Sequence, residues 1–159
     1  MTAVAALLAG GAETLGSAAE ARTLLAHAAG VEPSRLAVLA GISDEVAAAF
    51  GVLVEQRAAG VPVQYLTGRA WFRTVSVAVG PGVFVPRPET EVMTGWAIDR
   101  LHEVPGRPVV VELCAGSGAV SAAIAAELPG CQQHAVELSP DAVRAARANL
   151  AGTGVALVE

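Results

Sequence analysis

The sequence predicts an α/β fold, in which a small N-terminal helical bundle precedes the first half of a parallel sheet. Three observations support this fold class. The first 60 residues carry apolar side chains at helical spacing, and residues 71–85 alternate in the manner of hairpin strands. From residue 108 onwards, short apolar strands alternate with helices, which is typical of parallel βαβ units.

These changes of pattern divide the 159 residues into three parts. Residues 1–60 are expected to form the helical bundle, residues 61–88 a connector with a β-hairpin, and residues 89–159 a partial α/β domain. The length suits one domain, or one small domain and part of another.

The N-terminal part predicts successive helices. Ser17 and Glu20 form a capping-box pattern, in which the serine hydroxyl accepts a bond from the third helical amide and the glutamate reaches back. The helix that Ser17 opens is expected to end at Gly30, because glycine adopts the left-handed conformation without strain. A short helix should follow Pro33, and a longer one should begin at Ser43.

The hairpin is predicted from residues 71–79 and 83–85, in which β-branched and aromatic residues recur with the period of a strand. The run Gly80-Pro81-Gly82 between them predicts the turn. The prolines that follow cannot extend a strand, so a helix is expected to begin at Glu89 or Thr90.

The parallel sheet is predicted to begin with Val109–Leu113, an apolar run typical of a strand that is covered on both faces. A helix over residues 119–128 and a second strand over residues 133–137 should follow. A further helix should begin at Ser139, with a third strand at residues 155–158.

The first strand of such a sheet is normally central, with a neighbour on each side. Here only one half of the sheet is in the sequence, so the open side of Val109–Leu113 would be an apolar, unprotected edge. We therefore expect the chain to be a fragment, or to need a partner or self-association that covers this edge.

Two acidic residues frame a turn of small residues in this region. Glu112 lies at a predicted strand end just before the turn, and Glu137 ends the next strand, where its carboxylate can accept both hydroxyls of a ribose. A carboxylate at position 112 suits a cofactor with a free ammonium and a sulfonium, so we expect S-adenosylmethionine. The candidate cofactor-binding residues are Glu112, Cys114, Ala115, Gly116, Ser117, Gly118 and Glu137.

Two other interpretations of the turn remain open. Its glycines could only relieve crowding between a strand and a helix. A nicotinamide-dependent oxidoreductase would need the glycine pattern Gly-x-Gly-x-x-Gly. Only Gly116-x-Gly118 is present, displaced toward the helix, and the carboxylate of Glu112 would repel a pyrophosphate.

Composition and charge exclude several classes of function. The net charge is −5 and all ten basic residues are Arg, so no basic stripe favours direct nucleic-acid binding. No apolar run reaches the roughly 18 residues of a membrane span. Cys114 and Cys131, and the scattered histidines, have no metal-site spacing. Free thiols, and an N-terminus without the charge of a signal peptide, favour a cytoplasmic protein.

Two segments resemble motifs of a known family. Residues 60–68 resemble its linker motif, and residues 82–91, with Pro86-Arg87-Pro88, are similar to its proline-arginine-proline signature almost residue for residue. On these motifs the chain is identified as a member of the release-factor glutamine methyltransferases (the HemK family). The resemblance covers nearly the whole chain from about residue 20.

The resemblance implies a fold and an activity. It implies a helical bundle that helps to dock a class I peptide release factor, a β-hairpin linker, and a Rossmann-like class I methyltransferase domain. Members transfer the methyl group of S-adenosylmethionine to the side-chain amide nitrogen of the glutamine in the factor's Gly-Gly-Gln loop. The partner would then be a class I release factor and the cofactor S-adenosylmethionine.

The resemblance also implies roles for particular residues. The turn from Cys114 to Gly118 matches the cofactor turn, Glu137 the ribose acid, and Glu112 the acid that would face the methionine end. Arg87 and Thr90 lie in the signature near the site, with roles that the resemblance does not separate.

Three positions depart from the family pattern. Cys114 replaces the usual glycine, Ala115 the usual threonine, and Glu137 the usual aspartate. If position 114 has a positive φ, a Cβ atom there costs about 1 kcal/mol, which is enough to weaken cofactor binding several-fold.

The family's Asn-Pro-Pro-Tyr motif does not occur in this sequence. An amide nitrogen is a poor nucleophile, and that motif supplies the acceptors that orient it. We therefore expect no catalytic residue in this chain and no activity of the chain alone; the alternative is a non-catalytic protein that only binds release factors. Asn149, the only asparagine, is expected on an exposed helix surface, and Tyr65, Trp71 and Trp96 are expected to be packing residues.

Overall fold

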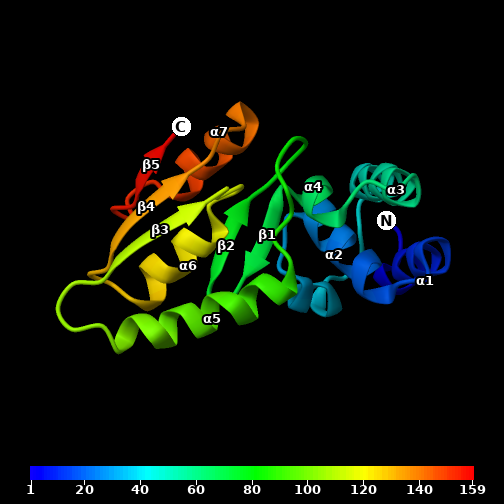
Figure 1. The fold of residues 1–159 in the computed structure, drawn as a ribbon. Coiled ribbons are helices and arrows are strands. Elements are labelled where there is room, and N and C mark those ends of the chain that lie inside the picture. The colour runs from blue at the N-terminus through cyan, green and yellow to red at the C-terminus, as the bar shows by residue number, and fades with distance from the viewer. The chain divides into compact units, whose positions relative to one another are not determined.

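The computed structural model describes residues 1–159, which separate into two compact units, Met1–Thr67 and Gly68–Glu159 (Figure 1). The first unit is built from helices. The second combines a hairpin, three helices and a parallel sheet. The predicted α/β class, with a helical part, a hairpin and a partial parallel sheet, is therefore confirmed. None of the helices is both long and apolar enough to cross a membrane.

The N-terminal unit has a hydrophobic core of its own. Its elements are α1 (Val4–Leu15), α2 (Ala18–Ala29), the 3-10 helix η1 (Pro33–Val38), α3 (Asp44–Ala58) and α4 (Val63–Thr67). Leu24 and Leu25 of α2 are fully buried, and Leu36 of η1 and Phe50 of α3 pack in the same cluster. The apolar positions at helical spacing therefore form one core, as an independent domain requires.

Serine caps begin α2 and α3. The Ser17 hydroxyl oxygen accepts a hydrogen bond from the Glu20 amide at 3.3 Å, and α2 ends at Gly30 with φ 64°. The other half of the predicted capping box is wrong. The Glu20 carboxylate instead accepts bonds from Nε and Nη2 of Arg57 on α3, at 2.8 and 3.1 Å. A two-point bond to a guanidinium is stronger than one bond to a neutral amide, so Glu20 joins α2 to α3.

Helix α4 occupies most of residues 61–68, where the sequence predicted a turn-rich connector. The Pro62 carbonyl accepts hydrogen bonds from the amides of Tyr65 and Leu66, at 3.0 and 3.2 Å, and so begins the helical turn. Leu66 also packs against the core of the N-terminal unit. A helix of five residues is too short to show helical periodicity, which is why the sequence pattern did not indicate it.

The C-terminal unit contains the remaining elements. They are β1 (Arg69–Phe72), β2 (Val75–Ala78), α5 (Pro88–His102), β3 (Val109–Leu113), α6 (Ala119–Glu127), β4 (Gln132–Val136), α7 (Pro140–Asn149) and β5 (Ala156–Val158). Helix α6 packs against β4 and both hairpin strands, and α7 packs against β2 and β5 (Figure 1). The two helices therefore join the hairpin to the parallel sheet.

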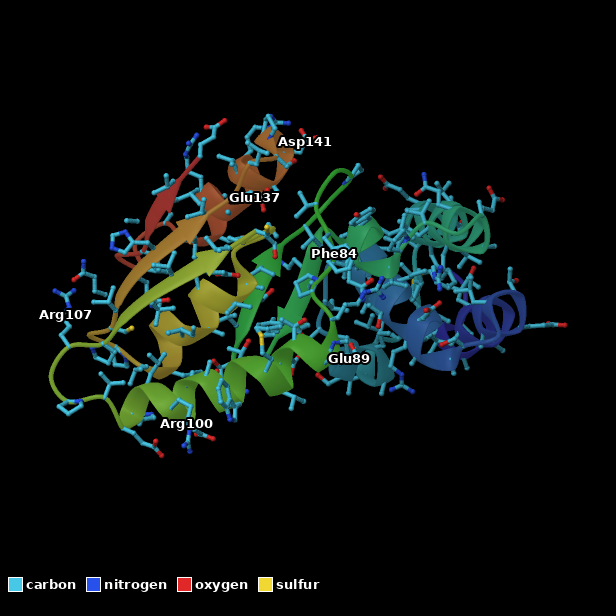
Figure 2. The ribbon with its side chains drawn as sticks, in the orientation of Figure 1. Phe84, Glu89, Arg100, Arg107, Glu137 and Asp141 are labelled. Atoms are coloured by element: carbon cyan, nitrogen blue, oxygen red, sulfur yellow. The ribbon has the colours of Figure 1, made fainter.

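The hairpin is present, but its predicted turn is wrong. Strands β1 and β2 are antiparallel, with Phe72 opposite Val75, so the chain reverses at residues 73–74 and not at residues 80–82. Residues 83–85 form no strand, and Phe84 lies in the segment that follows β2 (Figure 2). The residues that the sequence assigned to one long strand therefore hold the end of β1, the turn and the whole of β2.

A tertiary ion pair explains this turn. Arg73 has a φ of 50°, and its Nε and Nη2 donate to the Glu127 carboxylate at the end of α6, at 2.8 and 2.6 Å. Its Nη1 also donates to the Glu91 carbonyl at 3.0 Å. These partners lie far along the chain and hold a non-glycine residue in a left-handed conformation, so short-range turn signals do not reveal the reversal.

The parallel sheet has the order β3-β4-β5, which leaves one side of β3 unpaired, as the sequence predicts. The expectation that both faces of β3 are covered is wrong for this structure. Val109, Val111 and Leu113 are 60%, 58% and 70% exposed. Every second residue of the strand therefore faces solvent, because α6 and α7 supply no cover for that face.

Two predicted packing residues lie on the surface. Trp71 on β1 is 74% exposed and Trp96 on α5 is 65% exposed. In α5 the buried side chains are instead Thr94 and Ile98, and the Thr94 hydroxyl is satisfied by the Thr90 carbonyl at 2.8 Å. A tryptophan is usually assigned to the core because of its size, but here the small and aliphatic side chains fill it.

Candidate cofactor site

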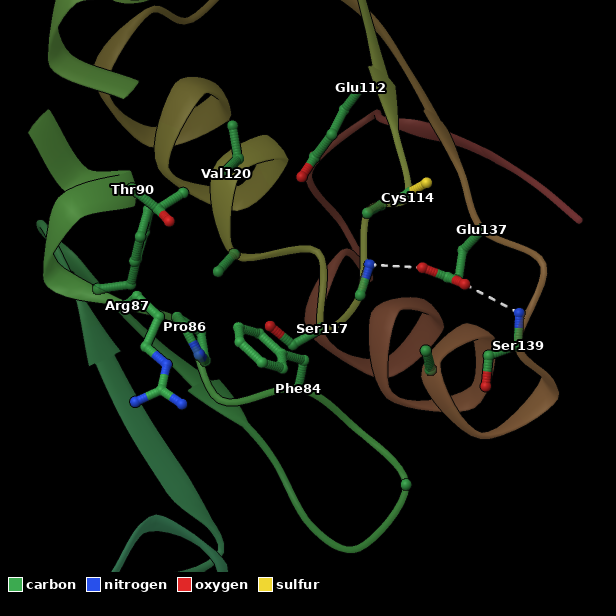
Figure 3. A pocket seen from close by; sticks show the side chains of 16 residues that line it. Phe84, Pro86, Arg87, Thr90, Glu112, Cys114, Ser117, Val120, Glu137 and Ser139 are labelled. Carbon is green, nitrogen blue, oxygen red and sulfur yellow. Dashed lines mark hydrogen bonds between the residues drawn. The ribbon is translucent and has the colours of Figure 1, made fainter. Parts of the chain in front are cut away.

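The carboxyl ends of the parallel strands meet at one edge of the sheet. Leu113 is paired with Val136, and Val136 with Val158, so the segments that follow β3 and β4 leave the sheet side by side. A pocket of about 420 Å³ opens there, entirely within the C-terminal unit (Figure 3). This size suits a small-molecule cofactor, and the edge is where parallel α/β sheets bind them.

One wall of the pocket is the turn between β3 and α6. Cys114, Gly116 and Gly118 have φ values of 57°, 57° and 76°, so three residues of the turn are left-handed. Gly118 also packs closely, because a Cβ atom there would lie 3.1 Å from the Leu150 side chain. The turn thus has the compact geometry expected of a loop that a cofactor approaches.

The conformation of Cys114 is strained for a residue other than glycine. Its φ of 57° is in the left-handed region, where a Cβ atom meets its own backbone. The side chain is exposed at the pocket as a free thiol. The strain of about 1 kcal/mol that the sequence predicts for a positive φ therefore applies.

Glu137 lies directly after β4 and closes this turn. Its Oε2 accepts a hydrogen bond from the Gly116 amide at 2.7 Å, and its Oε1 accepts one from the Ser139 amide at 2.8 Å (Figure 3). The same Oε1 also accepts a bond from the Leu138 amide at 2.8 Å. These amide bonds, that of Ser139 most strongly, hold the pKa of Glu137 below its usual value. The carboxylate therefore stays ionised at the pocket rim.

Glu112 reaches the pocket from β3 and also caps α6. Its Oε2 accepts hydrogen bonds from the Ser121 amide, at 2.9 Å, and from the Ser121 hydroxyl. Burial is the main cause that raises the pKa of Glu112, and the bonds from Ser121 oppose it. Both bonds go to one oxygen, so Oε1 is the atom that can serve a ligand. No sequence pattern indicates this role of Ser121, because only the fold brings Glu112 to it.

The opposite wall comes from the segment that follows the hairpin. Phe84, Pro86, Arg87 and Thr90 line it, and the Arg87 guanidinium carbon lies 5.2 Å from the centre of the Phe84 ring (Figure 3). Arg87 is the N-cap residue of α5 and Thr90 lies in its first turn. The fold thus brings the proline-arginine-proline segment and the small-residue turn to the two sides of one pocket.

Two of the candidate residues have little direct access to this pocket. Ala115 is 6% exposed and Ser117 is 3% exposed, although both line it. Ala115 donates its amide hydrogen to the Val136 carbonyl at 3.0 Å, which ties the turn to β4. Ala115 and Ser117 therefore shape the site through the course of their backbone and not through their side chains.

The expected placement of Asn149 on an exposed helix surface is wrong. Its Oδ1 accepts a hydrogen bond from the Ala78 amide at 2.8 Å. Its Nδ2 donates to the carbonyls of Ala78 and Ser117, both at 2.9 Å. Asn149 therefore links α7 to the hairpin and to the pocket turn. Its partners are backbone groups, which leave no trace in a sequence pattern.

The His, Cys, Asp and Glu side chains form no group of three or more that could hold a metal ion. The polar side chains that line the pocket are instead the carboxylates of Glu112 and Glu137, the Arg87 guanidinium, the Cys114 thiol, and the hydroxyls of Thr90, Ser117 and Ser139. This set suits an organic ligand that carries hydroxyl and ammonium groups.

Comparison with known proteins agrees with this arrangement. Residues 3–68 match the family model described as the PrmC N-terminal domain. The chain is 44% identical over 139 residues to the "Release factor glutamine methyltransferase" of Streptomyces coelicolor, which covers 87% of this chain and 49% of that protein. The protein of the same name from Mycolicibacterium smegmatis is 44% identical over 136 residues, covering 86% of this chain and 48% of that protein.

Over the half of their length that it spans, the chain matches the release factor glutamine methyltransferases. This confirms the family that the linker and proline-arginine-proline motifs indicate, and relatives with this name are enzymes. The chain spans about half the length of the curated relatives it matches.

A relative with a different name is nearly as similar. The "4-amino-L-phenylalanine/4-methylamino-L-phenylalanine methyltransferase" of Streptomyces pristinaespiralis is 39% identical over 145 residues, covering 89% of this chain and 49% of that protein. Relatives at this level of similarity therefore carry the names of methyltransferases with different substrates.

Proposed function

We propose that this chain forms the substrate-docking and cofactor-binding part of an S-adenosylmethionine-dependent methyltransferase. Its substrate would be the glutamine side-chain amide in the Gly-Gly-Gln loop of class I peptide release factors. The observation that carries the proposal is the pocket in which Glu112 and Glu137 face the segment of Phe84 and Arg87. The names of the relatives support the same activity.

The residues of the pocket fit this cofactor in charge and in shape. Glu112 has an oxygen, Oε1, that is not used by Ser121 and can accept a bond from an ammonium group. Glu137 uses three of the roughly four acceptor positions of a carboxylate, so it retains one for a ribose hydroxyl. Phe84 offers an aromatic surface at the opposite wall. When bound, the cofactor supplies a methyl group activated by its sulfonium.

Titration with S-adenosylhomocysteine tests the cofactor site. Wild-type chain should bind it in calorimetry, and Glu112→Gln should weaken binding by about ten-fold or more, because a bond to a charged group is lost. Glu159→Gln, at the exposed final residue, is the matched control and should bind like wild type. Binding of NADH in place of S-adenosylhomocysteine would contradict the proposal and support the oxidoreductase alternative.

The release factor is the proposed partner, and the match of residues 3–68 to the PrmC N-terminal domain is the observation that favours it. The full chain should retain a purified class I release factor in a pull-down. The second candidate substrate is an arylamine, favoured by the relative from Streptomyces pristinaespiralis. Retention of the factor without any binding of 4-amino-L-phenylalanine supports the first candidate; the reverse result supports the second.

We propose further that the chain alone binds the cofactor and the release factor but transfers no methyl group. An amide nitrogen needs hydrogen-bond acceptors that orient it toward the methyl donor. The only asparagine, Asn149, is already engaged by Ala78 and Ser117. Methylation of a Gly-Gly-Gln protein by this chain, followed with a radiolabelled methyl group, would contradict this part of the proposal.

The unpaired edge of β3 and the exposed face of Val109, Val111 and Leu113 suggest self-association in the absence of a covering segment or partner. Sedimentation should show species larger than the 16.0 kDa monomer. A single monomeric species that unfolds cooperatively would contradict this.

The free thiols of Cys114 and Cys131 fit a reducing compartment, and we propose the cytoplasm.

A further inference from the structure

The Asn149 side chain lies between two parts of the chain that are far apart in sequence. It is the last residue of α7, and it is half-buried. Its amide group makes one bond as acceptor and two as donor, all between 2.8 and 2.9 Å. An amide with three short bonds in fixed directions constrains both of the backbones it touches.

The first of these backbones is the end of the hairpin. Ala78 is the last residue of β2, and both its amide and its carbonyl bond to Asn149, in the way that a neighbouring strand would bond to it. The segment that follows Ala78 leads to Phe84 and Arg87, which line one wall of the pocket. Asn149 therefore holds Ala78, the residue at which the chain leaves β2 toward that wall.

The second backbone is the turn on the opposite wall. Asn149 Nδ2 donates to the carbonyl of Ser117, in the middle of the left-handed turn. In a longer helix the Ser121 amide would bond to that carbonyl. Here the Ser121 amide donates to Glu112 instead, so Asn149 supplies a donor to the Ser117 carbonyl.

We propose that Asn149 is a positioning residue that sets the separation of the two walls of the pocket. The inference rests on the proposed function, since it concerns the same pocket. It assigns to Asn149 an effect on cofactor affinity that is exerted through Ala78 and Ser117. Asn149 itself does not line the pocket.

Two substitutions of Asn149 distinguish the effect of its hydrogen-bond donor, Nδ2, from the effect of the whole side chain. Asn149→Asp keeps the shape, but an ionised carboxylate has no hydrogen to donate and would face the carbonyls of Ala78 and Ser117 with negative charge. Asn149→Ala removes all three bonds. Arg147→Ala, an exposed residue on the same helix, is the matched control.

The full chain is titrated with S-adenosylhomocysteine, and the alkylation rates of Cys114 and Cys131 are measured by mass spectrometry without ligand. Both Asn149 variants should bind about ten-fold or more weakly, with Arg147→Ala like wild type. Cys114, in the turn, should react several-fold faster in the Asn149 variants. Cys131, at the other end of α6 and half-buried, should react at the wild-type rate.

The two cysteines distinguish local positioning from general loss of structure. Faster reaction of both thiols, or of neither, would overturn the inference, as would wild-type affinity in Asn149→Ala. If wild-type chain binds no S-adenosylhomocysteine, the proposed function fails, but the Cys114 rates still test whether Asn149 holds the turn. If the alanine variant does not fold, Asn149→Gln, which keeps an amide one methylene further out, provides the same comparison.

Discussion

Glu112 of β3 accepts hydrogen bonds from both the amide and the hydroxyl of Ser121 on α6, and it does so with a single oxygen. One carboxylate therefore caps a helix and faces the pocket at the same time. The hydroxyl bond opposes the effect of burial on the Glu112 pKa. The protonation state of Glu112 therefore affects the hydrogen bonds that it accepts at the start of α6.

The raised pKa of Glu112 predicts a pH dependence of stability. Its folded pKa lies above its unfolded one, so the folded state binds more protons between the two values. The free energy of unfolding should therefore fall as pH rises from about 4 through the folded pKa. Glu112→Gln cannot ionise, so its stability relative to wild type should increase over that interval.

Urea denaturation at a series of pH values checks this prediction. Both tryptophans, Trp71 and Trp96, lie in the C-terminal unit, so their fluorescence reports the unit that contains Glu112. Glu159→Gln should follow the wild-type pH profile. A constant difference between Glu112→Gln and wild type at every pH would contradict the prediction.

The ion pair that fixes the hairpin turn should respond to pH in the opposite direction. The bond from Arg73 is the main cause that lowers the pKa of Glu127. Its stabilisation is therefore present above the unfolded pKa and is lost as pH falls through the folded pKa. Glu127→Gln should cost about 1–2 kcal/mol at neutral pH, and the cost should shrink in acid.

The same fluorescence assay measures the loss of Glu127, and Glu103→Gln is its control. Glu103 pairs with Arg100, but their side chains are 61% and 55% exposed. An exposed pair contributes little, so this control should change stability by less than about 0.5 kcal/mol. Equal losses from the two substitutions would show that the Arg73 pair does not stabilise the turn.

The left-handed conformation of Cys114 predicts that glycine is better there. Cys114→Gly should raise the free energy of unfolding by up to about 1 kcal/mol, because relief of the Cβ strain exceeds the added freedom of the unfolded chain. Cys114→Ala keeps the Cβ atom and should give no such gain. If alanine stabilises the protein as much as glycine does, the effect belongs to the thiol and not to the backbone.

The segment after the hairpin should tolerate no side chain at Gly82. Its φ is 85°, and a Cβ atom would lie 2.6 Å from Oδ2 of Asp141 on α7. Gly82→Ala should cost about 1–3 kcal/mol, measured by urea denaturation. Gly80 has open space around it and no positive φ, so Gly80→Ala should have a small effect. A large loss from Gly80→Ala would mean that the whole segment is sensitive, not this contact.

The sequence predicted those elements whose signals are local. The cap at Ser17, the stop at Gly30 and the strand Val109–Leu113 follow from a few adjacent residues, and the structure has them. The acids at positions 112 and 137 could be placed at one sheet edge because parallel strands end together. Local pattern and topology were enough for these features.

The errors have a common physical cause in contacts between distant residues. The hairpin turn depends on Arg73 and Glu127, which are 54 positions apart, and the carboxylate of Glu20 depends on Arg57, 37 positions away. Asn149 reaches Ala78 across 71 positions. Periodicity and turn propensities describe neighbours along the chain, so a single sequence does not contain these pairings in readable form.

The closure of the turn by Glu137 has a consequence for the thermodynamics of binding. The Gly116 amide is bonded to that carboxylate within the fold itself. The conformational entropy of the turn is therefore lost during folding and not when a ligand arrives. A ligand therefore meets a preorganised rim. Glu137 has one acceptor position left, so any further ligand hydroxyl must displace one of the backbone amides that donate to it. A first hydroxyl can therefore bind Glu137 without displacing an amide, whereas a second hydroxyl displaces one.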